Sequence, residues 1–379
     1  MTPDGRPVIA INALAVNPSN AGSRTMLTML VPALTELAPH LRLLLICHRD
    51  NRPLYDPDLE DIVVDLRSGG LLRRLEYDLF GVSRLVKGKA DVLVTPGNVG
   101  PLRCPVPQVA IVAAHLVLPS CQRAALPEQM PWLKRRYLGW PFKQYLKGAT
   151  SVLGISEFVA RGVVDELGID AAKVRAMPLG FAPPAGGPTR AGRNNDVLFV
   201  GTLYRYKDGD LAVRAFAQVR DQLPADSRLL IVGKDHNGEA ARLDALIREL
   251  GIEAAVDIRG SVESDELERL YRTSGVLLMP SKGEGFGLPV AEAMGYGLPV
   301  IAANATALPE VVGTAAVLVP VSDVDGFARA LVDVLTDPAR REAMTERGIA
   351  RAAELTWDAG AIALRDAIED ALAATGRVR

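Results

Sequence analysis

Short apolar runs recur along the chain and alternate with longer stretches of helical pattern. Such runs are typical of buried strands, and their regular alternation with helices is typical of a parallel sheet covered by helices. In the first half, strands are predicted over residues 8–12, 42–47, 61–66, 91–95, 108–114 and 151–155. A helix is predicted over residues 24–37, after the polar loop that follows the first strand.

The periodic pattern stops at residues 181–195, where proline, glycine and polar residues take over, as in a linker. Beyond this linker, strands are predicted over residues 196–201, 228–233, 252–259, 275–280, 298–302 and 317–319, and helices over residues 210–223 and 359–374. A chain of 379 residues is long for one core. The pattern therefore predicts two α/β domains.

Charge is distributed unevenly, although the net charge is only −2. Residues 1–175 hold 21 lysines and arginines against 16 aspartates and glutamates, and the remainder holds 22 against 29. A basic half and an acidic half indicate that only the first half faces something anionic. Nucleic acid is a poor candidate, because the isoelectric point is near 6.2 and no nucleic-acid motif is present.

Two segments of the first half concentrate the basic residues, at residues 71–89 and 132–147. The second segment interleaves its lysines and arginines with aromatic residues: Trp132, Tyr137, Trp140, Phe142 and Tyr145. This mixture suits an anionic membrane surface, and equally suits surface helices whose aromatic residues face the core. No run approaches the about 18 apolar residues of a membrane span, and no secretion signal is recognisable, so a cytoplasmic location is expected, with peripheral contact to the inner face of the plasma membrane as an option.

The cysteines are an odd, scattered set without paired spacing: Cys47, Cys104 and Cys121. We expect them to be reduced core residues, since neither a zinc site nor a disulfide framework has this arrangement. The four histidines are equally scattered, which argues against a histidine-based metal cluster.

The most informative segment spans residues 281–302, with the sequence SKGEGFGLPVAEAMGYGLPVIA. Pro289 suits the first turn of a helix, and Gly297 suits the position just past its end. A loop containing Gly283, Gly285 and Gly287 lets backbone N–H groups approach a ligand, and the helix N-terminus adds partial positive charge. The segment therefore predicts a site for a phosphate or pyrophosphate.

Glu284 and Glu292 lie eight residues apart around this loop. A carboxylate accepts hydrogen bonds from paired hydroxyls, as on a ribose or a hexose. With the phosphate site, the pair predicts a ligand that carries sugars on both sides of a diphosphate. The alternative is an ordinary loop, helix and strand with both glutamates solvated, but such a loop has no need of three glycines around a carboxylate.

This segment resembles the paired-glutamate motif of the fourth family of retaining glycosyltransferases, in both glutamates, in Phe-Gly-Leu-Pro at residues 286–289 and in the Glu-Ala-Met-Gly that follows. The resemblance implies the α/β GT-B fold, with two Rossmann-like domains facing across a cleft that holds the substrates. The corresponding domains are residues 1–183 for the acceptor and residues 184–357 for the nucleotide sugar. Residues 358–379 are then a terminal helix packing back toward the first domain.

The same resemblance proposes further site residues. Glu284 holds the hydroxyls of the donor sugar and Glu292 those of the ribose, while the donor also contacts the loop residues Gly285, Phe286, Gly287 and Leu288. Lys207 stands where relatives place a lysine that faces the diphosphate. Relatives commonly have arginine where this chain has Thr202, so Arg205 is a candidate substitute for that cation.

Other positions carry the resemblance more weakly. Gly260 and Val262 mark the place where relatives contact the nucleotide base through the backbone, so UDP and GDP stay equally open. Gly22 is what remains of paired glycines near the donor phosphate. His115 is registered with a family histidine that contacts the donor sugar or acceptor, which puts it with Glu284 and Lys207 among the catalytic candidates. Ser156 matches a family turn, or simply caps a helix.

Asp-x-Asp occurs at residues 56–58, 208–210 and 323–325, but none follows a buried strand as the metal-binding version does. We therefore expect transfer without a metal or other cofactor. Resemblance to the family implies that the transfer retains the anomeric configuration. The expected partners are a nucleotide sugar and a glycan or lipid-linked acceptor, as in bacterial surface-polysaccharide or lipopolysaccharide biosynthesis. Two alternatives are a sugar-nucleotide 2-epimerase of the same fold and a catalytically inactive binding subunit.

Overall fold

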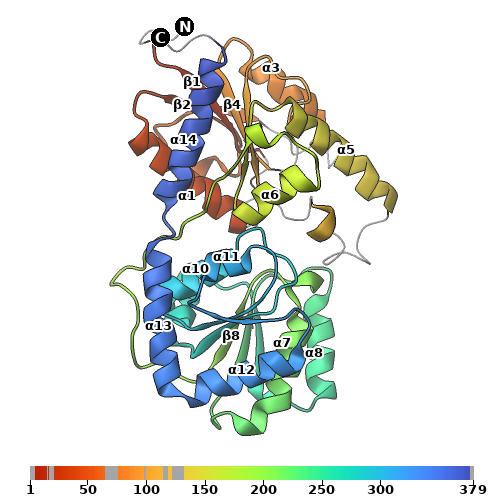
Figure 1. The fold of residues 1–379 in the computed structure, drawn as a ribbon, viewed down its shortest axis with the longest axis vertical. Helices are drawn as coiled ribbons and strands as arrows, with labels where there is room; N and C mark the ends of the chain where they lie inside the picture. Colours follow the sequence, from red (N-terminus) through yellow and green to blue (C-terminus); the bar gives the residue numbers. More distant parts are fainter. Residues whose placement is uncertain are drawn as a thin grey trace. The chain divides into compact units, whose positions relative to one another are not determined.

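The computed structural model describes residues 5–14, 16, 21–64, 76–97, 100–113, 118–121 and 132–375, with backbone alone for residues 21 and 132–138. The chain forms two compact units, each built on its own parallel sheet (Figure 1). The first unit contains the described residues up to Leu179 and the chain from Trp357 onward, and the second contains Gly180–Thr356. The expected boundary at residues 183/184 falls just inside the second unit.

In its described residues, the first unit has the strand order β3-β2-β1-β4-β5-β6-β7, with every pairing parallel. The strands are β1 (Val8–Asn12), β2 (Arg42–His48), β3 (Glu60–Val64), β4 (Val92–Pro96), β5 (Gln108–Val112), β6 (Ser151–Gly154) and β7 (Val174–Ala176). The central strands are buried throughout, which explains their continuous apolar runs. The edge strand β7 has an arginine at its centre, so its sequence gave no strand signal.

The helices described in the first unit are α1 (Ala21–Leu37), α3 (Val82–Val86), α5 (Trp132–Gly148), α6 (Glu157–Asp165) and α14 (Trp357–Ala373). Helix α14 packs along α1, so the end of the chain belongs to the first unit (Figure 1). Ser156 caps α6, because its Oγ accepts a hydrogen bond from the Val159 N–H at 3.1 Å. Among the described helices, none is long and apolar enough to cross a membrane.

The described strands of the second unit follow the order β10-β9-β8-β11-β12-β13, again parallel. They are β8 (Val197–Val200), β9 (Leu229–Val232), β10 (Val256–Gly260), β11 (Val276–Met279), β12 (Val300–Ala303) and β13 (Val317–Val319). The helices are α7 (Gly209–Val219), α8 (Glu239–Glu249), α9 (Ser264–Thr273), α10 (Leu288–Gly295), α11 (Leu308–Val312), α12 (Val324–Thr336) and α13 (Pro338–Ala353).

The strand predicted over residues 252–259 is wrong in its first part. Glu253–Ala255 form a short 3₁₀ turn, and pairing begins only where Val256 meets Leu229. Apolar residues on either side of this turn made it look like part of the strand.

Strand β8 lies between β9 and β11, so the direction of the strand order reverses there. In open α/β sheets, the loops at the carboxyl ends of such neighbouring strands form the ligand site. At this edge the backbone is tightly packed: a Cβ on Gly233 would lie 1.8 Å from the Gly201 carbonyl oxygen. Only glycine allows the loops after β8 and β9 to approach this closely.

The segment 181–195 has neither helix nor strand, as its composition predicted. Arg193 fastens it to the second unit: the buried guanidinium donates to the carbonyls of Tyr271 at 2.7 Å and Tyr296 at 2.6 Å, and further to those of Arg272, Ser274 and Thr189. Burial, reinforced by repulsion from Arg272 and Arg341, lowers the pKa of Arg193 to about 10. Because this value stays well above neutral pH, the anchor remains charged.

Candidate functional site

The glycine-rich loop connects β11 to α10 and ends at Gly287. Gly287 has φ of +103°, which favours glycine, and a Cβ there would lie 2.8 Å from Leu308 Cδ2, so a larger residue would also have to displace the Leu308 side chain. Pro289 lies in the first turn of α10, and Gly297, with φ of +73°, follows its end. Both helix bounds predicted from the sequence are confirmed.

Three hydrogen bonds fix the path of this loop. The Ser281 hydroxyl donates to the Gly283 carbonyl at 3.1 Å. The Lys282 N–H donates to the Tyr206 carbonyl at 2.8 Å, which joins the loop to the segment after β8. The Glu284 N–H donates to the Thr306 hydroxyl oxygen at 2.8 Å, which joins it to the segment after β12. The loop is thus held from both neighbouring connections.

Lys207 and Glu284 meet at the centre of this arrangement. Lys207 Nζ lies 2.6 Å from Glu284 Oε1, and the two residues are only 9% and 7% exposed. Lys207 comes from the short helix Arg205–Lys207 that follows β8, and Glu284 from the loop that follows β11. Two buried charges are tolerated when they are paired in this way, so each is positioned by the other. These are two of the three catalytic candidates.

Glu292 has a partner of its own. The Tyr271 hydroxyl donates to Glu292 Oε2 at 2.8 Å, and the Tyr271 ring stacks on Tyr296 with centroids 5.4 Å apart. Burial raises the pKa of the Glu292 carboxyl, and the hydrogen bond from Tyr271 opposes this rise. Tyr271 was not anticipated: on α9 it has the spacing of a core residue, and only the need of a buried hydroxyl for a partner could have pointed to it.

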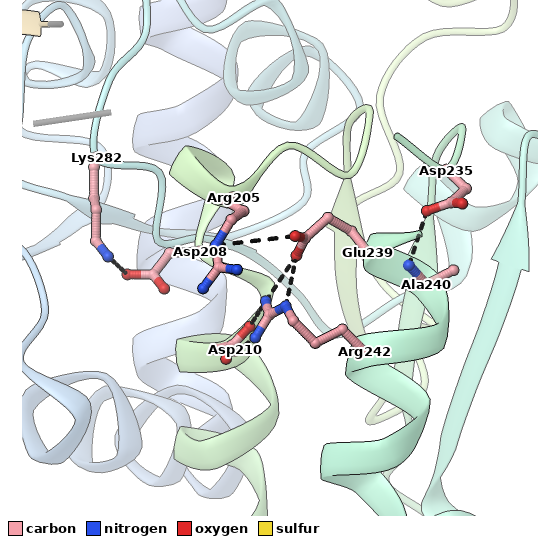
Figure 2. Close-up of polar contacts among 8 residues, drawn as sticks. All are labelled: Arg205, Asp208, Asp210, Asp235, Glu239, Ala240, Arg242 and Lys282. Carbon is pink, nitrogen blue, oxygen red and sulfur yellow. Dashed lines mark hydrogen bonds and ion pairs between the residues drawn. The ribbon is translucent and has the colours of Figure 1, made fainter. Parts of the chain in front are cut away.

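Arg205 is engaged elsewhere. Its Nε lies 3.9 Å from Oε1 of Glu239, the first residue of α8, and Arg242 donates to the other Glu239 oxygen at 2.7 Å (Figure 2). Arg242 also pairs with Asp210. The structure therefore joins Arg205 to a charge network between α7 and α8, in which Glu239 lies between the two arginines. A role for Arg205 at the diphosphate stays a prediction.

The remaining loop candidates lie along the same edge of the second sheet. Thr202, partly buried, lies between two residues whose N–H groups bond to the β9 side, to Val232 and Lys234. Gly260, with φ of +65°, ends β10 and accepts a hydrogen bond from the Gly233 N–H at 2.8 Å. The other candidates on this edge are Val262 and Leu288, partly buried, and Gly285 and Phe286, buried.

Two candidates belong to the first part of the chain. Gly22 lies in the first turn of α1 and is exposed. His115 lies outside the described residues, so its role as a catalytic candidate stays a prediction.

The aspartates of the three Asp-x-Asp sequences have other partners. Asp208 pairs with Lys282 at 2.9 Å and Asp210 with Arg242 (Figure 2). Burial raises the pKa of Asp208, against the effect of Lys282. Asp323 caps α12 through the Gly326 N–H. In the sequence at residues 56–58, the Asp56 side chain accepts a hydrogen bond from the Asp58 N–H at 2.9 Å. In the described part of the chain, no three histidine, cysteine, aspartate or glutamate side chains gather as a metal site would need.

The second unit thus combines a parallel sheet, a buried lysine–glutamate pair and a glycine-rich helix start. Comparison with known proteins identifies the family. Residues 188–351 match the family model of the glycosyl transferases group 1. The chain is 32% identical over 312 residues to D-inositol 3-phosphate glycosyltransferase of Kineococcus radiotolerans, covering 74% of this chain and 71% of that protein. It is 28% identical over 246 residues to O-antigen chain mannosyltransferase B of Escherichia coli, covering 61% and 64%. The chain belongs to the group 1 glycosyltransferase family.

Solved structures confirm the GT-B fold. Sucrose-phosphate synthase from Thermosynechococcus elongatus superimposes with a TM-score of 0.76 at 22% identity, over 97% of this chain and all (100%) of that one. HepE of Anabaena, in complex with UDP and glucose, gives 0.73 at 16% identity, over 96% and 100%. WaaG, a glycosyltransferase involved in lipopolysaccharide biosynthesis, gives 0.71 at 17% identity, over 94% and 98%. At these identities the likeness extends to the fold alone.

Neutralising one partner of the buried ion pair should destabilise the protein more than neutralising both. Lys207→Met leaves the Glu284 carboxylate buried without a cation, which should lower the free energy of unfolding by about 3–5 kcal/mol. Adding Glu284→Gln to it should restore most of this loss, because no charge then remains buried. Urea unfolding of the wild type, both single variants and the double variant measures the coupling. Additive losses would mean that the two charges do not stabilise each other.

The raised pKa of Glu292 predicts a pH-dependent difference from Glu292→Gln. A carboxyl whose pKa is higher in the folded state destabilises the fold as pH rises through that range, because the buried group must then ionise. Glutamine stays neutral and still accepts from Tyr271. The melting temperature of Glu292→Gln minus that of the wild type should therefore grow as pH rises above about 4, where an ordinary glutamate carboxyl ionises. A difference in melting temperature that does not change with pH would show that the pKa of Glu292 is not raised in the folded protein.

Proposed function

We propose that this protein is a retaining, metal-independent hexosyltransferase that takes its sugar from a nucleoside-diphosphate sugar, UDP- or GDP-linked, bound by the second unit. The observation that carries the proposal is the buried Lys207–Glu284 pair beside the start of α10. A structural ion pair has no need of a glycine-rich loop and a helix N-terminus next to it. A diphosphate with a sugar on each side needs all three.

Each part of the site has a role in this scheme. Lys207, the loop N–H groups and the N-terminus of α10 stabilise the charge that develops on the departing nucleotide. Glu284 accepts hydrogen bonds from the donor sugar hydroxyls, and Glu292, held by Tyr271, offers its other oxygen to the ribose. Gly260 and Val262 contact the base through their backbone, and Thr202 lines the approach to the phosphates.

Retention follows if departure and attack take place on the same face of the sugar. The leaving phosphate then takes the proton of the acceptor hydroxyl, and no side chain acts as nucleophile. His115 orients the acceptor or the donor sugar. Metal independence is supported by the pairing of Asp208 with Lys282 and of Asp210 with Arg242, since both carboxylates already neutralise cations of this chain.

For the acceptor we propose a glycan or lipid-linked sugar of bacterial surface-polysaccharide or lipopolysaccharide assembly, reached at the inner face of the plasma membrane. Support comes from the names of two similar proteins, an O-antigen mannosyltransferase and a lipopolysaccharide glycosyltransferase. Other relatives are named for D-inositol 3-phosphate, so a soluble phosphorylated polyol belongs in the acceptor tests.

A panel of donors identifies the reaction. The protein is incubated with UDP-glucose, UDP-galactose, UDP-N-acetylglucosamine, GDP-mannose or GDP-rhamnose in EDTA, and released nucleotide and thermal shift are recorded. One donor should both stabilise the protein and release nucleotide, and Glu284→Gln should reduce release by about 100-fold or more. A donor converted without release would indicate an epimerase. A donor that stabilises the protein without release or conversion would favour an inactive binding subunit, and a panel with neither shift nor release would count against the proposal.

Membrane contact has a separate test on α5. Trp140 is 62% exposed there, while Phe142 and Tyr145 of the same helix are buried. Co-sedimentation with anionic vesicles at low salt should capture the protein, and Trp140→Ala should weaken capture because the exposed ring is lost. Ile362→Ala on α14 is the matched control, removing another exposed apolar side chain. Equal capture of both variants, or none of the wild type, would count against this surface.

A further inference from the structure

Thr306 adopts a backbone conformation that its side chain disfavours. It lies in the connection between β12 and α11 with φ of +53°. The other described non-glycine residues with positive φ are Asp208, Asn237 and Ser322, and none of these is β-branched. A branched Cβ crowds the backbone in the left-handed region, so threonine is strained where asparagine or glycine would be comfortable.

The side chain makes a contact that glycine could not reproduce, because glycine has no side-chain acceptor. The Thr306 hydroxyl oxygen accepts the hydrogen bond of the Glu284 N–H at 2.8 Å. One further contact joins the same pair of loops, because Leu308 Cδ2 would lie 2.8 Å from a Cβ on Gly287. Within the connection itself, the Leu308 N–H bonds to the Ala305 carbonyl at 3.1 Å. The connection after β12 therefore braces the glycine-rich loop at Glu284 and again at its end.

The Thr306 hydroxyl contacts Glu284, whose carboxylate pairs with Lys207. Glu284 uses its backbone N–H for Thr306 and its side chain for Lys207, so the first contact sets the position from which the second is made. The loop around it contains glycines and has little stiffness of its own. Strain that persists at such a point is typical of sites where geometry is held for function.

We propose that Thr306 is a positioning residue for sugar transfer: its hydroxyl holds the backbone of Glu284 so that the carboxylate faces the donor sugar and Lys207. This inference rests on the proposed function of the second unit and adds to it a residue outside the paired-glutamate motif. Thr306 touches neither substrate nor reacting atoms in this scheme and acts through Glu284.

Three variants separate the hydroxyl from the backbone strain. Thr306→Val keeps the shape and strain but lacks the acceptor, Thr306→Gly relieves the strain and also lacks the acceptor, and Thr306→Ser keeps the acceptor without the branch. With the donor found active, kcat should fall about 10- to 100-fold in both the valine and glycine variants, because the Glu284 N–H loses its partner. Serine should recover most of the rate. Affinity for the free nucleoside diphosphate should change less than about twofold, since Glu284 faces the sugar.

Melting temperatures separate a positioning role of Thr306 from a purely structural one, because in a structural role the loss of kcat would follow the loss of stability. Thr306→Gly should melt at a higher temperature than Thr306→Val, although both are equally slow, because glycine tolerates the positive φ. Thr345→Val is the control: Thr345 is a buried threonine that donates to the Gly297 carbonyl at 3.0 Å, so its loss should lower the melting temperature and leave kcat in place. Hydrogen exchange of the peptide around Glu284 should be faster in the valine and glycine variants only.

The outcomes are distinct. If the wild type transfers sugar and Thr306→Val keeps its kcat, or if kcat follows melting temperature across the variants, this inference is overturned and the proposed function stands. If the wild type releases nucleotide from no donor, the proposed function fails and the role of Thr306 in transfer fails with it. Unchanged exchange in all three variants overturns the contact itself, whatever the activity.

Discussion

The buried ion pair between Lys207 and Glu284 is the constraint on which the rest of the second unit depends. The two residues leave the sheet from β8 and β11, neighbours at the point where the strand order reverses. Either charge alone would be costly to bury, so the two connections must meet with their side chains in register. Several features of the surrounding backbone hold these connections together. They are the close approach of Gly233 to Gly201, the hydrogen bond from the Lys282 N–H to the Tyr206 carbonyl, and the positive φ of Thr306.

The second glutamate depends on a different support. Glu292 is held by Tyr271, Tyr271 stacks on Tyr296, and the guanidinium of Arg193 binds the carbonyls of both tyrosines. Arg193, in the first residues of the second unit, thus holds the backbone of both tyrosines beside Glu292. The two carboxylates of one motif therefore differ: Glu284 faces a cation, while Glu292 has only a neutral donor and a raised pKa.

The features that could be predicted from the sequence depend on residues close together in the chain. Strands such as β8 and β12 are short apolar runs buried on both faces, and Pro289 and Gly297 bound α10 by conformational preferences that do not depend on the rest of the fold. The paired glutamates were proposed from their motif and spacing, and Lys207 from the resemblance to the family. Residues 252–255 were misassigned because an apolar turn before a strand has the same composition as the strand.

The features that sequence could not predict are contacts between distant segments. Tyr271 looks like a core residue of α9, and Thr306 like a loop residue, until the fold brings them to Glu292 and Glu284. Arg205 shows the reverse: it stands near Lys207 in sequence, yet its side chain faces Glu239, which also pairs with Arg242. A charge two residues from a site residue says little about which way it points.

The central claim is that the Lys207–Glu284 pair is the donor site of a sugar transferase. A crystal structure of the protein soaked with the nucleoside diphosphate of its active donor tests it most directly. We expect the diphosphate against the glycine-rich loop, with an oxygen within hydrogen-bonding distance of Lys207 Nζ and the ribose hydroxyls at Glu292. A nucleotide bound elsewhere, with Lys207 still closed on Glu284 and no density beside α10, would contradict it.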